Sequence, residues 1–97
     1  MRTWIEKLAK AIKNEGIEMG GYFPMAIRFK NYEISLYVYS NRNSESHISI
    51  SELDKDNKIM RSHNIILYKD ETDLLLKIFT KIQEETEDYF IEQFNNL

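Results

Sequence analysis

Cysteine is absent from this chain of 97 residues. Its absence excludes disulfide bonds, thiolate-ligated zinc sites and cysteine nucleophiles at once. No apolar run approaches the roughly 20 residues that a membrane-spanning helix needs. The opening stretch MRTWIEKLAK mixes acidic and basic side chains and lacks the apolar segment of a secretory signal. We therefore expect a cytoplasmic protein without a membrane segment.

Glycine and proline are also scarce, at three residues and one residue respectively. No linker, repeat or low-complexity tract interrupts the chain, and EMGGYFP (residues 18–24) has the composition of a flexible turn. The chain is 42% hydrophobic and 30% charged, which excludes a disordered chain as a class. We expect one domain covering residues 1–97, with room for a single core.

Basic residues become rare toward the end of the sequence. Residues 1–69 hold 11 Lys and Arg against 8 Asp and Glu, whereas residues 70–97 hold 2 against 8, within a total net charge of −3. The acidic excess therefore belongs to the last segment. Five of its carboxylates follow closely in the sequence, and we name them the acidic stretch: Glu84, Glu85, Glu87, Asp88 and Glu92.

The first segment of the chain has the pattern of an amphipathic helix. Thr3 and Glu6 have capping-box spacing, in which each side chain bonds a backbone N–H near the helix start. Apolar residues then recur at helical spacing from Ile5 to Ile12. Gly16 is placed to end this helix in the left-handed conformation.

The last segment has a longer apolar stripe. Asp70 is the expected N-cap, and Thr86 interrupts the stripe. A helix of about 26 residues would be ~39 Å long, whereas a compact domain of this size has a radius of gyration of ~12–13 Å. We expect the helix either to extend beyond its own sheet or to kink near residues 84–86. The stripe contains Leu75, Ile78, Phe79, Ile82, Tyr89, Phe90 and Phe94.

Between these helices, four segments have the composition and alternation of strands. Polar turns separate them, and DKDNK (residues 54–58) has the side chains of a tight turn. We predict an α+β fold of order α-β-β-β-β-α, in which a four-stranded antiparallel meander carries the N-terminal helix and the long C-terminal helix on one face. The strands are MAIRF (25–29), YEISLYVYS (32–40), SHISISEL (46–53) and IMRSHNIILY (59–68).

The register of the strands follows from the apolar alternation and the lengths of the turns. Only residues 30 and 31 separate the first two strands, so we expect a two-residue hairpin turn with Ile27 opposite Ile34. Closing the next loop between residues 40 and 46 places Tyr39 opposite His47. The fourth strand contains two sets of apolar residues that would point to opposite faces of the sheet. The sequence therefore does not decide which set faces the helices, and it predicts a bulge in this strand.

The face of the sheet turned away from the helices is the first candidate for a binding surface. Tyr37 and Tyr39 alternate with Leu36 and Val38, so they point away from the core. Tyrosine offers a large contact area with a polar tip and is enriched in recognition surfaces. Tyrosine and serine also suit open sheets that bind nothing. We name as the sheet-face site Arg28, Tyr37, Tyr39, His47 and Ser49.

Signals for catalysis are weak. His47 and His63 lie on adjacent predicted strands and could be close, but no third ligand at metal-site spacing accompanies them. Asp54 and Asp56 begin like a calcium loop, yet Lys58 occupies the next ligand position and the central glycine is missing. The sequence contains no nucleophile motif and no glycine loop that could cradle a phosphate. We expect neither an enzyme nor a bound cofactor or metal.

Three functions are compatible with this pattern. The profile of a small, acidic, single-domain and cysteine-free chain resembles that of phage- or plasmid-borne inhibitors, anti-defence proteins and toxin-immunity proteins, a likeness of type that transfers no residue roles. It favours a protein that occludes a partner protein through the sheet-face site and the acidic stretch. One alternative is a nucleic-acid-binding module that adds the basic residues Arg28, Lys30, Arg42 and Arg61 to the tyrosines. The other is a homodimer whose seam is the tyrosine face or the long helix.

Overall fold

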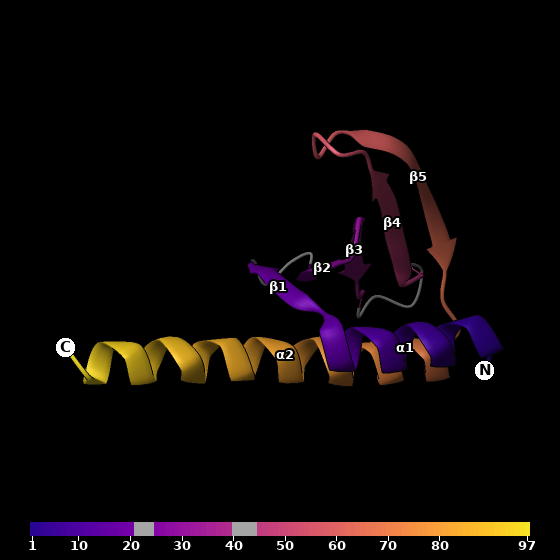
Figure 1. Cartoon of the computed structure of the whole chain (residues 1–97). Coiled ribbons are helices and arrows are strands. Elements are labelled where there is room, and N and C mark those ends of the chain that lie inside the picture. Colours follow the sequence, from indigo (N-terminus) through magenta and orange to yellow (C-terminus); the bar gives the residue numbers. More distant parts are fainter. Residues whose placement is uncertain (21–24, 40–44) are drawn as a thin grey trace.

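A computed structural model describes residues 1–20, 25–39 and 45–97 of the chain. Its five strands form one antiparallel sheet in the order β1-β2-β3-β4-β5, and both helices lie on one face of it (Figure 1). The predicted α+β meander is therefore confirmed. The elements are α1 (Thr3–Glu15), β1 (Ile17–Gly20), β2 (Met25–Phe29), β3 (Tyr32–Tyr37), β4 (His47–Leu53), β5 (Ile59–Ile66) and α2 (Lys69–Asn95).

Strand β1 is an addition to the four predicted strands, all of which form. The sequence predicts a turn over residues 18–24, but residues 17–20 pair with β2, and residues 21–24 lie outside the described residues. Gly16 is extended (φ −71°, ψ 140°) and not left-handed, so the chain passes from α1 directly into β1. A Cβ at this position would lie 2.5 Å from the carbonyl oxygen of Ile12, so the position requires glycine for close approach.

Both helices begin differently from the prediction. The N-cap of α1 is Arg2, so Thr3 is already helical and the expected capping box with Glu6 is wrong. The N-cap of α2 is Tyr68, which places Asp70 inside the first turn and not at the cap. The physical reason is a shared carboxylate near the start of α2, which bonds the backbone at both helix starts and is described below.

The core lies between the helices and the sheet. α1 and α2 run side by side in the same direction and begin near the end of β5 (Figure 1). The inward-facing residues of β2, β3 and β4 pack against both helices. Each aliphatic side chain buried in this way contributes roughly 1.5–3 kcal/mol. The core cluster contains Ile5, Ala9, Ile12, Ile27, Ile34, Leu36, Ile48, Leu67, Leu75, Phe79 and Ile82.

The β2–β3 hairpin has the predicted register. Ile27 lies opposite Ile34, and the turn consists of two residues, as expected. Lys30 has a positive backbone angle in this turn, with φ at 52°. A non-glycine residue in that conformation is held at a cost of roughly 1–2 kcal/mol, which the pairing of the two strands offsets.

The β3–β4 hairpin has a register two residues away from the prediction. Tyr37, and not Tyr39, lies opposite His47, because β3 ends at Tyr37 and the connection is longer than expected. Residues 40–44 of this connection lie outside the described residues. Since side chains alternate with a period of two, a shift of two residues leaves each of them on its predicted face.

The facing of β5 is decided by its pairing with β4. Ile65 lies opposite Ile48 and packs toward the helices, whereas Ile66 lies opposite His47 and faces away from them. The bulge expected in this strand is confirmed, because Glu52 pairs with Arg61 and the next residue, Leu53, pairs with Ile59, which leaves Met60 of β5 as the extra residue. The far end of the β4–β5 hairpin extends away from both helices (Figure 1), which leaves most of β5 exposed.

Candidate functional site

Three aromatic side chains meet at one end of the sheet. Tyr37 ends β3 and His47 begins β4, and the register places them side by side. Their ring centroids lie 4.5 Å apart with 10° between the planes, and the ring of Tyr39 lies 6.0 Å from that of His47 at 24°. Ile66, on the other side of His47, is 56% exposed. We name Tyr37, Tyr39 and His47 the aromatic cluster.

The parity of the strands places the aromatic cluster on the face away from the helices. Leu36 and Ile48 are buried in the core, so Tyr37 and His47, their neighbours in the chain, point to the opposite face. Ser49 follows two residues after His47 in β4 and shares its face. The structure thus brings together four of the five residues of the sheet-face site.

Arg28 is the residue of the sheet-face site that lies apart. It lies opposite Glu33, which is four residues before Tyr37 and therefore ~13 Å away along β3. Its Nε donates to the carbonyl oxygen of Lys30 at 2.9 Å, and its Nη2 donates to Oδ1 of Asn57 at 3.0 Å. Arg28 therefore joins the β2–β3 turn to the β4–β5 turn, a structural role that its sequence position does not reveal.

The other basic residues considered for nucleic-acid binding do not gather at the aromatic cluster. Nε of Arg61 in β5 lies 2.9 Å from Oε1 of Glu52, on the side of the hairpin that faces the helices. Nζ of Lys30 lies 5.3 Å from the ring centroid of Phe29, at the β2–β3 turn. Arg42 lies outside the described residues. The described cations of this set are therefore engaged elsewhere in the sheet.

The two histidines lie on opposite faces of the sheet. His63 is opposite Ile50, on the helix-facing side, whereas His47 belongs to the aromatic cluster on the outer face. The two histidine side chains are therefore not close, although their strands are adjacent, because side chains alternate between the faces and these two positions point to opposite ones. Within residues 1–20, 25–39 and 45–97, no group of three or more His, Cys, Asp or Glu side chains could hold a metal ion.

The acidic stretch lies on the second half of α2, and all five of its side chains are exposed. The structure has one uninterrupted helix from Lys69 to Asn95 in place of the alternative kink near residues 84–86. Thr86 does not break it, because its hydroxyl donates to the carbonyl oxygen of Ile82 at 2.9 Å within the helix. Carboxylates along such a helix form a charged ridge that attracts basic surfaces.

The last part of α2 extends beyond the sheet (Figure 1), as its length predicts. Every residue from position 87 onward is exposed, and we name residues 87–95 the overhang. Phe90 and Phe94 are 52% and 67% exposed, whereas Phe79 in the first half of the helix is 1% exposed. The radius of gyration, 14.3 Å, exceeds the ~12–13 Å of a compact chain of this length.

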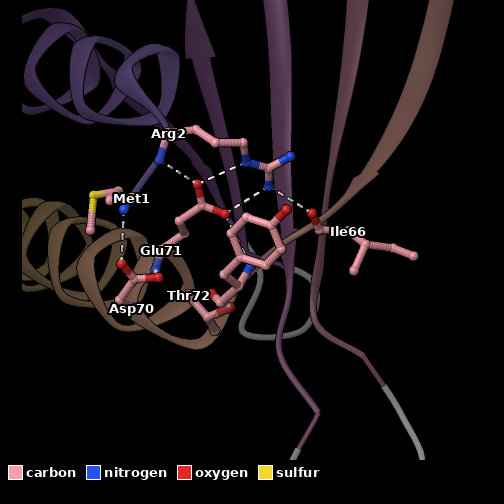
Figure 2. Close-up of polar contacts among 7 residues, drawn as sticks. Met1, Arg2, Ile66, Asp70, Glu71 and Thr72 are labelled. Carbon is pink, nitrogen blue, oxygen red and sulfur yellow. Dashed lines mark hydrogen bonds and ion pairs between the residues drawn. The ribbon is translucent and has the colours of Figure 1, made fainter.

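An ion pair between a partly exposed arginine, Arg2, and a buried glutamate, Glu71, joins the starts of the two helices (Figure 2), and the sequence pattern does not predict it. Glu71 is fully buried and accepts hydrogen bonds from the backbone N–H of Arg2 (3.1 Å), from its Nε (2.9 Å) and from its Nη2 (2.7 Å). Glu71 also accepts a bond from the backbone N–H of Tyr68 at 3.0 Å. Because Arg2 and Tyr68 are the two N-caps, one carboxylate satisfies a backbone donor at each helix start.

The guanidinium of Arg2 is held from several sides. Its Nη2 also donates to the carbonyl oxygen of Ile66 at 2.8 Å, which ties the end of β5 to both helices (Figure 2). Its central carbon lies 4.5 Å from the ring centroid of Tyr68 and 5.4 Å from that of Trp4, within the range of cation–π attraction. These contacts keep the cation beside its buried partner.

Electrostatics at this ion pair are strongly perturbed. Hydrogen bonds from the side chain of Arg2 lower the pKa of Glu71 to about 2, although burial by itself favours the neutral acid. The same bonds raise the pKa of Arg2 above its ordinary value. Perturbed carboxylates are candidates for catalysis, but this one is enclosed by the contacts that hold the helices. We interpret it as a structural anchor. A Glu three residues after the N-cap of α2 is the one local signal that could have indicated it.

Comparison of the chain with protein-family models, with curated proteins and with solved structures found no match. Neither α1 nor α2 combines the length with the apolar character needed to cross a membrane. Because a fold alone transfers no function, function must be inferred from the surfaces of the molecule itself.

Proposed function

We propose that this chain is a small cytoplasmic protein-binding protein, which occludes a surface of another protein in the manner of an inhibitor or an immunity protein. The observation that supports the proposal is the aromatic cluster, whose rings stack on a sheet face that neither helix covers. Aromatic side chains dominate the energetics of interfaces because they bury a large area with few rotatable bonds.

The preference of tyrosine for open sheets accounts for single tyrosines, but the cluster has further properties of a contact surface. The near-parallel stacking of Tyr37 on His47 orients both rings before a partner arrives, which reduces the conformational entropy lost on binding. Ile66 adds exposed apolar surface next to His47, and Ser49 adds a polar group on the same face. An apolar centre with a polar margin is the usual composition of a protein interface.

The acidic stretch serves the same function as a second element. It lies in the helix layer, whereas the aromatic cluster lies on the opposite face of the sheet, so a small partner would contact one of them at a time. We assign the main contact to the aromatic cluster. The carboxylates of α2 then accelerate encounter with a basic partner and select against acidic ones.

A nucleic-acid-binding module is the second candidate, since stacked rings on a sheet can also stack on bases. The contacts of Arg28 with Asn57 and of Arg61 with Glu52 weaken it, because they draw both guanidinium groups away from the rings. A gel shift with single-stranded RNA and DNA at low salt tests this candidate, because electrostatic binding is strongest there. A shift that the substitutions Tyr37→Ser and Tyr39→Ser abolish would favour nucleic acid over protein as the ligand.

Affinity capture tests the proposed function. The tagged chain is expressed in its native cells, and the captured proteins are identified by mass spectrometry. The double variant with Tyr37→Ser and Tyr39→Ser should keep its fold, because both side chains lie on the outer face, and should lose the specific partner. Removing hot-spot aromatics lowers affinity by 2 kcal/mol or more, which corresponds to roughly 30-fold in Kd.

The matched control is Met60→Ser, which removes an exposed apolar side chain from β5 at a position six residues before Ile66, the partner of His47. It should retain the partner that the double variant loses. Retention of the same partner by the double variant, at the wild-type level, would remove the aromatic cluster from the proposal.

Charge reversal at Glu84, Glu85 and Asp88 tests the acidic stretch separately, and we expect it to slow association without abolishing capture.

A further inference from the structure

The overhang leaves the sheet at its β1 edge. α2 continues past β1, and no described strand lies over its last turns (Figure 1). With a rise of 1.5 Å per residue, residues 87–95 extend roughly 13 Å, which is about the width of three strands spaced ~4.8 Å apart. The overhang is therefore long enough to cover strands that this chain does not supply.

The overhang also continues the apolar stripe that faces the sheet. At about 100° per residue, Phe90 and Phe94 point within about 60° of the direction of Phe79, which is buried under the sheet. Asp88 and Glu92 point to roughly the opposite side of the helix. The aromatic side of the overhang therefore faces the plane of the sheet, continued beyond β1, where a further strand would lie. The two carboxylates face away from that plane.

Strand β1 provides the edge to which such a strand would add. Among the described strands β1 pairs only with β2, so its other side presents unpaired backbone N–H and C=O groups. Where α1 ends and α2 leaves the sheet, the surface is hollowed next to this edge. The apolar side chains of the hollow are Ile17, Ile82, Tyr89 and Phe90, and its lining is completed by Gly16 and by the polar residues Lys13, Asn14, Glu85 and Thr86. A backbone edge next to an apolar surface is the arrangement to which an added strand binds.

We infer that the added strand is β1 of a second copy of this chain, so that two chains form a homodimer with one continuous sheet. Antiparallel pairing of β1 with its own copy is compatible with a two-fold axis, because both chains use the same edge. Under this symmetry each overhang lies against the β1 side of the other chain. The aromatic cluster stays on the outer face, so the homodimer does not rest on the proposed function.

The size of this surface favours a second copy over a short peptide. A single added strand would cover about one third of the overhang, whereas a second sheet supplies several strands at the required spacing. A large apolar side chain has roughly 200 Å² of surface, and five apolar residues here are 47–69% exposed, so together they present on the order of 600 Å² per chain. That area approaches the ≈800 Å² that each partner buries in a stable interface. These residues are Ile17, Met19, Tyr89, Phe90 and Phe94.

The other edge of the sheet provides a comparison within the same molecule. β5 is also paired on one side in the described sheet, but its hairpin extends away from the helices, and both helices begin beside its end and run toward the other edge (Figure 1). Ile66 in β5 and Ile17 in β1 are both exposed isoleucines on edge strands. The same substitution at these two positions therefore distinguishes the two edges.

Light scattering on the purified chain tests the homodimer. The wild-type chain, of 11.6 kDa, should elute with twice that mass. Phe90→Ser combined with Phe94→Ser should give the mass of one chain, because it removes the apolar contact of the overhang. Ile17→Lys should also give the mass of one chain, because it places like charges where the two β1 strands meet at the two-fold axis. Ile66→Lys, on the other edge strand, should keep the doubled mass. Circular dichroism checks that each variant is folded.

Several results would overturn the inference. One is a wild-type chain that keeps the mass of one chain at concentrations up to about 1 mM. Another is a doubled mass that persists in either the phenylalanine variant or Ile17→Lys. A mass that grows beyond two chains with concentration would indicate open-ended association in place of a two-fold pair. Should a variant fail to fold, hydrogen exchange of the wild-type chain decides, because the amides of β1 must become more protected as concentration rises.

Discussion

In residues 69–86 of α2, Leu75 and Phe79 are fully buried beneath the sheet, whereas Phe90 and Phe94 in the overhang are more than half exposed. The two parts have the same apolar periodicity and belong to one uninterrupted helix. They differ in what lies over them, because the sheet ends at β1 while the helix continues. An apolar stripe therefore predicts that a helix face can be buried, and it does not predict that the same chain buries it.

The two ends of α2 differ in the same way. At the first end, Glu71 and Arg2 join both helices and the end of β5 through three half-buried hydrogen bonds to the carboxylate and one exposed hydrogen bond to β5. At the other end, the last turn contains no basic residue, and the backbone N–H of Asn96 closes the helix by bonding the carbonyl oxygen of Glu92. One end is fixed by tertiary contacts, and the other depends on helical propensity or on a partner.

The largest expected effect is a difference in stability when the same substitution is made in residues 69–86 of α2 and in the overhang. Phe79→Ala should lower the free energy of unfolding by about 3–5 kcal/mol, because it leaves a cavity in the core. Phe90→Ala, at a concentration where the chain is monomeric, should change it by about 0.5 kcal/mol or less. Urea denaturation of both variants measures the difference. Equal losses at the two positions would mean that the overhang packs against its own chain in solution.

The second prediction compares two glutamates of the same helix. Glu71→Gln should lower the free energy of unfolding by about 1.5–3 kcal/mol, because a neutral amide accepts weaker hydrogen bonds from the partly exposed guanidinium of Arg2 than the carboxylate does. Glu87→Gln, on the overhang, should lie within about 0.5 kcal/mol of the wild type. Thermal unfolding of the two variants provides the measurement, and a negligible effect at Glu71 would contradict its role as an anchor.

The difference in the free energy of unfolding between the wild type and Glu71→Gln should depend on pH, because the pKa of Glu71 is lowered. Its pKa in the folded chain is about 2, below the ordinary value of 4.5, so its contribution is complete above about pH 4.5 and is lost as the pH falls toward 2. The stability of the wild type should therefore approach that of Glu71→Gln over this window. A difference that stays constant between pH 5 and pH 2 would show that the folded-state pKa is not lowered.

The smallest expected effect concerns the unanchored end. Glu92→Lys places a cation in the last turn of α2, where the helix dipole favours positive charge, and should stabilise that end by about 0.3–1 kcal/mol. Far-UV circular dichroism should show a small gain in helix content. Glu84→Lys, in the middle of the helix, serves as the control and should give no comparable gain, since the dipole effect is confined to the terminal turns.

Local patterns predicted the elements whose partners are close in the sequence. The β2–β3 register follows from a two-residue turn, and the outward facing of Tyr37 follows from strand alternation alone. The β3–β4 register was predicted wrongly by two residues because a longer connection does not fix where a strand ends. Strand β1 was not predicted, since four residues containing Gly20 carry too little strand signal.

Contacts between distant residues were beyond local patterns. Arg2 and Glu71 are 69 residues apart, and the spacing of Glu71 from the N-cap Tyr68 indicates a capping residue without indicating its contact with Arg2. Arg28 was predicted as part of a binding surface, but its contact with Asn57 depends on two turns meeting at one end of the sheet. Such contacts are fixed by the arrangement of the strands, which only the folded chain reveals.

The sequence by itself determined the fold class, the two amphipathic helices and the side of the sheet on which each side chain lies, because periods of 2 and about 3.6 residues are local properties of the backbone. Only the tertiary structure decided which part of an apolar stripe is buried, which carboxylate anchors the helices and where the aromatic side chains meet. Burial and pairing depend on which distant parts of the chain lie nearby in the folded molecule. A local period contains no information about those parts.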